Sequence, residues 1–180
     1  MPDGGVLLIC MGVSGAGKTT LARALAERHD MRFIEADDHH PESNRAHMAA
    51  GRPLTDEMRE PWIRTLCDLA GEATREGQSC VLAYSGLRSA HRQRFRDIGA
   101  PVLFIHLSGE LDEISRRMTG RKGHYMPASL LQSQFDDLES TREEADVLEL
   151  AVGPELETLL ARAEAAVLEL RGTNRPAALD

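Results

Sequence analysis

The chain has 180 residues, and its 42% hydrophobic and 28% charged content is typical of one soluble globular domain. The formal net charge of −8 excludes a surface suited to non-specific nucleic-acid binding, so a local basic cluster has to meet any anionic ligand. The sequence has no apolar run of membrane-spanning length and no secretory signal, so we expect a cytoplasmic protein without a nucleic-acid or membrane partner.

A glycine-rich stretch near the start predicts a phosphate-binding loop. It follows an apolar run at residues 6–11, typical of a buried parallel strand, and precedes apolar residues at helical spacing. In the pattern GxxxxGKT the glycines let backbone N–H groups approach phosphate oxygens, Lys18 reaches the β and γ phosphates, and Thr19 offers a hydroxyl to Mg²⁺. We therefore expect a nucleoside triphosphate and Mg²⁺ as cofactors, bound by Gly12, Val13, Ser14, Gly15, Ala16, Gly17, Lys18, Thr19 and Thr20.

A second, short strand is expected at residues 33–34, followed directly by acids. Glu35, Asp37 and Asp38 would then lie at the carboxyl end of that strand, where open α/β sheets bind their ligands. The composition of this stretch also allows a solvated turn that caps a helix.

The rest of the chain alternates between helical and extended patterns, which predicts a three-layer α/β/α domain around a parallel sheet. We place the domain at residues 1–171 and a C-terminal tail at 172–180. Thr55 is expected to cap a helix, and Pro61 to mark the first turn of the next one, which ends at Gly77. Further strands are expected at 80–84, 102–107 and 147–152, and further helices at 42–50, 88–96, 110–118, 127–139 and 156–170.

Basic residues gather around Gly120 and Gly123 in this otherwise acidic chain. Glycines between cations favour a mobile lid that closes over phosphates, at about residues 116–126, over a charge run that is merely solvated. The cations are Arg116, Arg117, Arg121, Lys122 and His124.

Companion motifs favour a small-molecule kinase among the proteins that have such a loop. The NKxD string that binds guanine is missing, and the DxxG string at residues 68–71 falls within a helical pattern. Neither the strand at 80–84 nor the strand at 102–107 ends in an acid, unlike the strand that supports Mg²⁺ in motor ATPases. A kinase needs what this chain offers, namely a loop for ATP, acids beside an acceptor hydroxyl and a lid that excludes water.

Four motifs in consistent order resemble the gluconokinase family. They are MGVSGAGK at 11–18, DDHHPESNR at 37–45, PLTD with REPW at 53–62, and RKGHY at 121–125, and the resemblance spans about residues 5–152. It implies a nucleoside-monophosphate-kinase-like P-loop fold with sheet order 2-3-1-4-5. It also implies Mg²⁺-dependent transfer of the ATP γ-phosphoryl group to the 6-hydroxyl of D-gluconate, and commonly a homodimer.

The resemblance further implies roles for individual residues. Lys18 would act in catalysis by binding the phosphates of ATP. Asp37 would orient the acceptor hydroxyl and accept its proton. Arg117 and the catalytic Arg121 would close on the transferring phosphoryl group, and an arginine fork would suit the carboxylate of the acceptor. Thr19 and, through water, Glu35 would bind the metal. The polyhydroxy acceptor would be bound by Asp37, His40, Asn44, Arg45, Arg59, Arg88 and His124.

The acceptor side of the chain departs from the family pattern. His47 stands where lysine is usual, Thr55 where asparagine is usual, and Met58 where a polar residue is common. Ser89 and His91 replace a lysine and a tyrosine, and the Glu-x-Pro of the family after the lid helix is missing. These departures keep open another polyol, a cyclitol or a shikimate-like acceptor, and also a regulator that binds nucleotide without catalysis.

Overall fold

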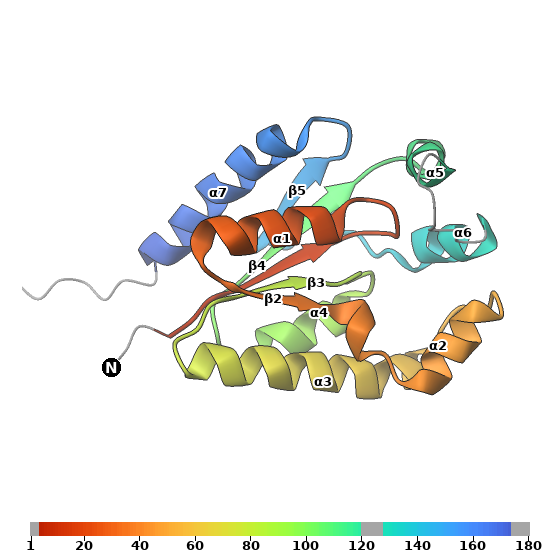
Figure 1. Cartoon of the computed structure of the whole chain (residues 1–180), viewed down its shortest axis with the longest axis horizontal. Coiled ribbons are helices and arrows are strands. Elements are labelled where there is room, and N and C mark those ends of the chain that lie inside the picture. The colour runs from red at the N-terminus through yellow and green to blue at the C-terminus, as the bar shows by residue number, and fades with distance from the viewer. Residues whose placement is uncertain (1–3, 120–127, 174–180) are drawn as a thin grey trace, which may run out of the picture.

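A five-stranded parallel sheet forms the framework of the molecule (Figure 1). The computed structural model describes residues 4–119 and 128–173. The strand order is β2-β3-β1-β4-β5, as the family resemblance implies, and every neighbouring pair is parallel, as the sequence pattern predicts. The strands are β1 (Leu7–Met11), β2 (Arg32–Glu35), β3 (Cys80–Ala83), β4 (Val102–Ser108) and β5 (Val147–Ala151).

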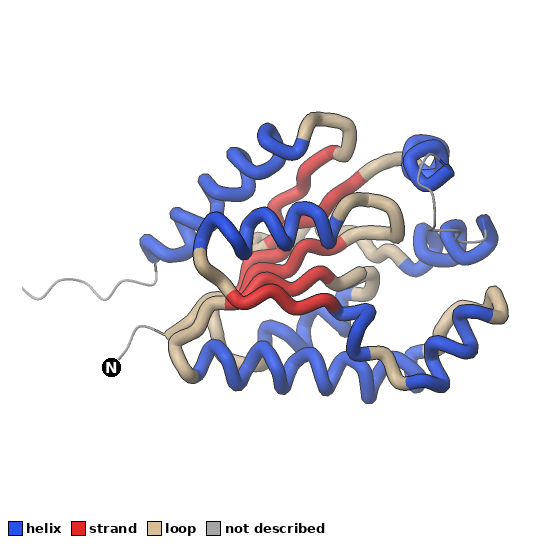
Figure 2. The backbone as a smooth tube through the Cα atoms, in the orientation of Figure 1, coloured by secondary structure: helices blue, strands red, loops and turns tan. Residues whose placement is uncertain are grey.

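Helices cover both faces of the sheet and thereby confirm the three-layer architecture (Figures 1 and 2). One face carries α1 (Lys18–His29) and α7 (Leu156–Thr173), and the other carries α3 (Asp56–Arg75) and α4 (Ser89–Arg96). Three helices lie beyond the tips of the strand arrows in Figure 1 and so surround the carboxyl end of the sheet. They are α2 (Glu42–Ala49), α5 (Leu111–Thr119) and α6 (Ala128–Asp137).

The central strand β1 is buried on both faces, which explains its continuous apolar sequence. Leu8 and Cys10 pack into the hydrophobic cluster under α1 and α7. Leu7, Ile9 and Met11 point the other way, into the cluster under α3 and α4. Because successive side chains of a strand point to opposite faces, both faces of β1 have to be apolar to hold two helix layers.

The expectation that Pro61 starts a new helix is wrong. Helix α3 runs without interruption from Asp56 to Arg75 and contains Pro61. The Thr55 side chain caps its start, as expected, by accepting a hydrogen bond from the backbone N–H of Met58 (3.3 Å). A proline so close to the N-terminus leaves only the carbonyl one turn earlier without its donor, and the exposed first turn lets water replace it.

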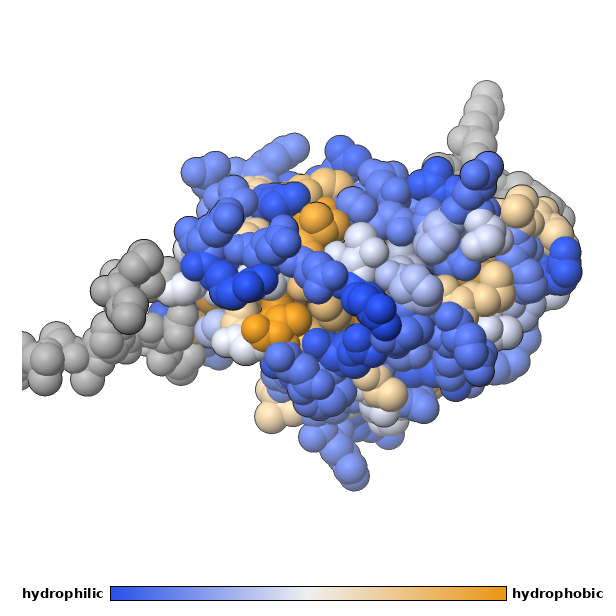
Figure 3. Space-filling model, turned by 90° about the horizontal axis from the view of Figure 1, so that it is seen from below, coloured by the Kyte–Doolittle hydropathy of each residue, from blue (hydrophilic) through white to orange (hydrophobic). Residues whose placement is uncertain are grey.

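The face of the molecule that Figure 3 shows is mostly polar. Hydrophilic side chains cover most of the face that Figure 3 shows, and apolar residues form separate small areas between them. Within residues 4–119 and 128–173 the structure contains no helix long and apolar enough to cross a membrane.

Candidate functional site

The glycine-rich stretch forms the connection between β1 and α1 at the carboxyl end of the central strand, as predicted. Gly12 and Gly15 have φ angles of +141° and +81°, in the region that favours glycine. A Cβ on Gly12 would lie 2.7 Å from the carbonyl oxygen of Leu107, and one on Gly15 would lie 2.5 Å from Cγ of Met118. Both the backbone conformation and the close packing against β4 and α5 therefore require glycine at these positions.

Lys18 is the first residue of α1, and its ammonium group is held within the loop. Its Nζ donates a hydrogen bond to the carbonyl oxygen of Val13 (2.9 Å). Burial lowers the pKa of Lys18, while the negative charges of Asp37 and Glu35 act in the opposite direction. The loop lysine is thus close enough to the acids after β2 to be influenced by them.

Thr19 and Glu35, the two expected metal residues, are in direct contact. The Thr19 hydroxyl donates a hydrogen bond of 2.6 Å to Oε2 of Glu35, the last residue of β2. The described parts of the chain contain no group of three or more His, Cys, Asp or Glu side chains that could hold a metal ion by themselves. This sparse oxygen pair fits Mg²⁺, which takes one or two protein ligands and completes its octahedron with phosphate and water.

Asp37 lies in the short 3₁₀ helix η1 (Ala36–His39), directly after β2, with its side chain 83% exposed. Its Oδ1 is 3.7 Å from Nε2 of His40, whose buried ring stacks on Trp62 at a centroid distance of 3.8 Å. Burial lowers the pKa of His40 against the opposing charge of Asp37 and so favours the neutral ring. Trp62 in turn donates a 2.7 Å hydrogen bond to the carbonyl of Ala36, so α3 anchors the turn that presents Asp37.

Two candidate acceptor contacts, Asn44 and Arg45, fasten α2 to its surroundings. The buried Asn44 donates a 2.9 Å hydrogen bond to the carbonyl of Met58 in α3. Arg45 donates to the carbonyl of Asp38 at 2.9 Å, and its side chain is exposed. The amide nitrogen of Asn44 therefore has a structural partner, whereas the rest of the Arg45 guanidinium faces solvent.

Arg59 and Arg88 meet in an ion-pair ring with two carboxylates, Asp56 and Asp137. Arg59 donates to Asp56 at 3.0 Å and to Asp137 at 2.7 Å. Arg88 donates to the second oxygen of each carboxylate, at 3.3 Å and 2.7 Å respectively. Burial raises the pKa of Asp137, but the hydrogen bonds from both arginines outweigh that effect and hold it below its usual range. The structure thus brings the two predicted arginines together, on an anion that belongs to the chain itself.

Sequence reasoning missed Gln134 and Asp137, which lie on α6. The Ser14 backbone N–H in the phosphate-binding loop donates to Oε1 of Gln134 at 2.7 Å, and Nε2 of Gln134 lies 3.2 Å from the Ser14 hydroxyl. Ser14 and Gln134 are 120 residues apart, and no pattern in a single sequence predicts a contact over that separation. Helix α6 therefore touches both the nucleotide loop and the arginines.

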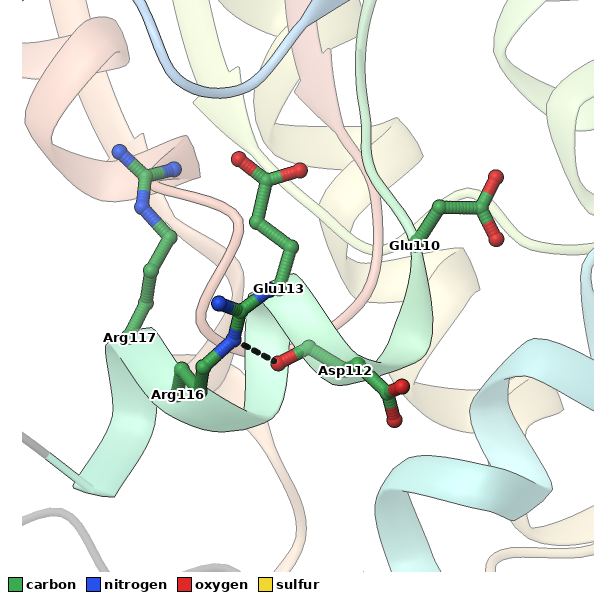
Figure 4. Close-up of a pocket in the computed structure, with 5 residues that line it drawn as sticks. All are labelled: Glu110, Asp112, Glu113, Arg116 and Arg117. Atoms are coloured by element: carbon green, nitrogen blue, oxygen red, sulfur yellow. Dashed lines mark hydrogen bonds between the residues drawn. The ribbon is translucent and has the colours of Figure 1, made fainter.

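Arg117 lies on α5, where it lines a surface hollow of about 550 Å³ (Figure 4). The other residues in its lining are Glu110, Asp112, Glu113 and Arg116. The single hydrogen bond drawn there runs from Nε of Arg116 to the backbone oxygen of Asp112, at 3.2 Å. Two further predicted residues, Arg121 and His124, lie outside the described residues, as does most of the predicted lid.

Comparison with known proteins identifies the family. A family model described as an AAA domain matches residues 7–145. The gluconokinase of Gluconobacter oxydans is 40% identical over 144 residues, which cover 80% of this chain and 81% of that protein. A probable gluconokinase of Rattus norvegicus is 37% identical over 187 residues, covering 94% of this chain and 98% of the relative.

Solved structures agree with this assignment. The crystal structure of a gluconokinase from Sinorhizobium meliloti is 34% identical, with a TM-score of 0.82 over 96% of this chain and 95% of the other. An unliganded sugar kinase from Janibacter is 38% identical, with a TM-score of 0.86 over 96% of this chain and 99% of the other. The loop, the acids after β2 and these relatives lead to one conclusion: the chain belongs to the gluconokinase family of P-loop kinases.

Proposed function

We propose that this protein transfers the γ-phosphoryl group of ATP to the 6-hydroxyl of D-gluconate and so produces 6-phosphogluconate. One observation carries the proposal: Thr19, next to Lys18 of the nucleotide loop, donates a 2.6 Å hydrogen bond to Glu35, two residues before the exposed Asp37 at the carboxyl edge of the same sheet. A phosphate-binding cation beside an accessible carboxylate is what phosphoryl transfer to a hydroxyl requires. The choice of D-gluconate as the acceptor rests on the gluconokinases among the relatives.

Positioning and charge do most of the work in such a reaction. The loop N–H groups and Lys18 would bind the β and γ phosphates, and Asp37 would hold the acceptor hydroxyl in line and accept its proton. Thr19 and, through water, Glu35 would hold Mg²⁺, which when bound neutralises charge on the phosphate oxygens. We propose Arg117 and Arg121 as partners of the transferring group. The acceptor contacts proposed with Asp37 are His40, Asn44, Arg45, Arg59, Arg88 and His124.

A panel of acceptors tested with labelled ATP decides the function. D-Gluconate is expected to be the best acceptor, and its product should be labelled at the 6-position. Turnover of another polyol, a cyclitol or shikimate without turnover of gluconate would refute the acceptor that we propose. ATP binding without transfer to any acceptor would instead indicate a regulator.

Replacing Glu35 by glutamine is expected to raise the Mg²⁺ concentration for half-maximal activity by about 10–100-fold, the usual cost of losing an outer-shell partner of a metal. The reason is the 2.6 Å hydrogen bond by which Glu35 orients the Thr19 hydroxyl. The measurement is initial rate against free Mg²⁺ at saturating ATP. Glu42→Gln, an exposed acid at the start of α2, is the control and should leave the Mg²⁺ dependence unchanged. Equal Mg²⁺ curves for wild type and Glu35→Gln would remove Glu35 from the metal site.

The resemblance to the family also supports a homodimer, and the cytoplasm is the location expected from the sequence. The tail expected from composition at residues 172–180 overlaps the end of α7, which includes residues 172 and 173. We propose both the assembly and the location for this chain. Light scattering after size-exclusion chromatography should then give twice the 19.8 kDa mass of the chain. A mass of one chain at micromolar concentration would contradict the dimer.

A further inference from the structure

The carboxylate of Asp137 lies where two guanidinium groups converge. Each of its oxygens accepts a 2.7 Å hydrogen bond, one from Arg59 and one from Arg88. Asp137 and Arg59 are shielded, with 19% and 13% of their side chains exposed, whereas Arg88 is 36% exposed. Two guanidinium groups converging on one carboxylate form a strong, directional anion site. This anion site is therefore fully built, and a side chain of the protein fills it.

The two acids of the ring differ in how they are attached. Asp56 is three residues before Arg59 on the same helix, so their pairing is local. Asp137 comes from α6, 78 residues away from Arg59 along the chain. It is also the last residue of α6, where the partial negative charge of the helix C-terminus disfavours a carboxylate. The local helix structure therefore does not explain why an acid stands at position 137, whereas its hydrogen bonds to the two arginines do.

A second observation indicates that the ring is not the final arrangement of these arginines. The Nε of Arg88 is buried and has no hydrogen-bond partner in the part of the chain that the structure describes. A buried donor without an acceptor is costly, and a ligand that adds acceptor oxygens at this position would satisfy it. A polyhydroxy acid carries both a carboxylate and neighbouring hydroxyl oxygens.

We propose that Asp137 is a specificity-determining residue that occupies the position of the acceptor carboxylate on Arg59 and Arg88 and is displaced by it. This inference rests on the proposed function, because it requires an acceptor that carries a carboxylate. Rotation of the Asp137 side chain would release one nitrogen of each arginine while Asp56 keeps its contact with the other, and α6 can stay in place through its buried Leu131. An uncharged polyol cannot replace the lost ion pairs, so the exchange selects for acids.

Asp137→Asn tests the proposal, with Asp136→Asn as the matched control. Asp136 is the preceding residue of α6 and accepts a hydrogen bond from Gln132 at 2.9 Å, away from the arginines. Because an amide competes for guanidinium groups less well than a carboxylate, we expect Asp137→Asn to lower KM for D-gluconate about three- to tenfold with little change in kcat. Asp136→Asn should match the wild type, and Asp137→Glu should restore the higher KM.

An unchanged or increased KM in Asp137→Asn would overturn the proposal and leave Asp137 as a positioning residue for the arginines. If that variant does not fold, the wild type gives the answer by NMR: adding D-gluconate should shift the carboxyl ¹³C resonance of Asp137, and an unshifted resonance overturns the proposal. Wild-type turnover of gluconate is measured first. Its absence would refute the proposed function, whereas normal wild-type turnover with an unaltered variant would refute the role of Asp137 alone.

Discussion

Replacing Asp37 by asparagine is expected to reduce kcat for transfer to D-gluconate by roughly 10²–10⁴-fold, the range that a positioned general base contributes. The carboxylate is 83% exposed at the carboxyl end of β2, and the stacked pair of His40 and Trp62 supports the turn that carries it. Asparagine keeps the size of the side chain but cannot take the proton of the acceptor hydroxyl. Steady-state rates at saturating ATP and gluconate measure the loss, and calorimetric titration with ATP should show that nucleotide binding is kept.

Asp38→Asn is the matched control for this experiment. Asp38 is the next residue of η1, and its backbone carbonyl rather than its carboxylate is the group that holds Arg45. Its kcat should stay close to that of the wild type. Because the charge of Asp37 partly offsets the lowering of the Lys18 pKa by burial, the pH profile of both variants should be recorded, so that a shifted lysine is not mistaken for a missing base. Unchanged turnover in Asp37→Asn would exclude it as the base.

The donor half of the site could be predicted from the sequence because its signals are local. One contiguous segment contains the apolar run of β1, the glycines and Lys18. Neighbouring residues therefore supply the backbone N–H groups and the cation that bind a phosphate. The acids after β2 follow from a general property of parallel sheets, since the carboxyl ends of all strands lie at one edge. Sheet order came from the family resemblance, and the structure confirms it.

The proposed acceptor half depends on contacts between distant segments, which no local pattern encodes. Sequence reasoning selected Arg59 and Arg88 but could not foresee that Asp137 joins them, because α3, the start of α4 and α6 meet only in the folded chain. Gln134 on Ser14 was missed for the same reason. Pro61 was misread because proline is usually a boundary signal, and its position near the N-terminus of α3 makes it tolerable.

Helix α4 contains the clearest case of a charge pattern with a hidden structural role. The helix expected at residues 88–96 carries four arginines, which is typical of a solvated face, yet Arg92 is fully buried. Its guanidinium donates to the carbonyl of Gly86 at 2.7 Å, to that of Leu87 at 3.1 Å, and with two nitrogens to the carboxylate of Glu144. Arg92 thereby ties the segment after β3 to the segment before β5.

Arg92→Met is expected to lower the free energy of unfolding by about 3–5 kcal/mol, the usual cost of breaking a buried ion pair by removing one partner. Methionine fills the volume but leaves the carbonyl of Gly86 without its side-chain donor and that of Leu87 with the N–H of Glu139 alone (2.8 Å). Glu144 keeps Arg96 as its remaining partner. Urea unfolding followed by circular dichroism measures the change through the midpoint at constant m-value.

Arg94→Met on the same helix is the matched control, because the ion pair of Arg94 with Glu60 is 39% and 41% exposed and exposed pairs contribute about 0–1 kcal/mol. Similar losses in both variants would show that burial gives Arg92 no special role. A double-mutant cycle with Glu144→Gln then separates the stabilisation by the Arg92–Glu144 ion pair from the stabilisation by the hydrogen bonds to the carbonyls. If the ion pair dominates, the loss in Arg92→Met should shrink when Glu144 is already neutral. If the carbonyls dominate, the loss should be the same in both backgrounds, and Arg92 would stabilise the fold chiefly by satisfying the backbone next to the acceptor site.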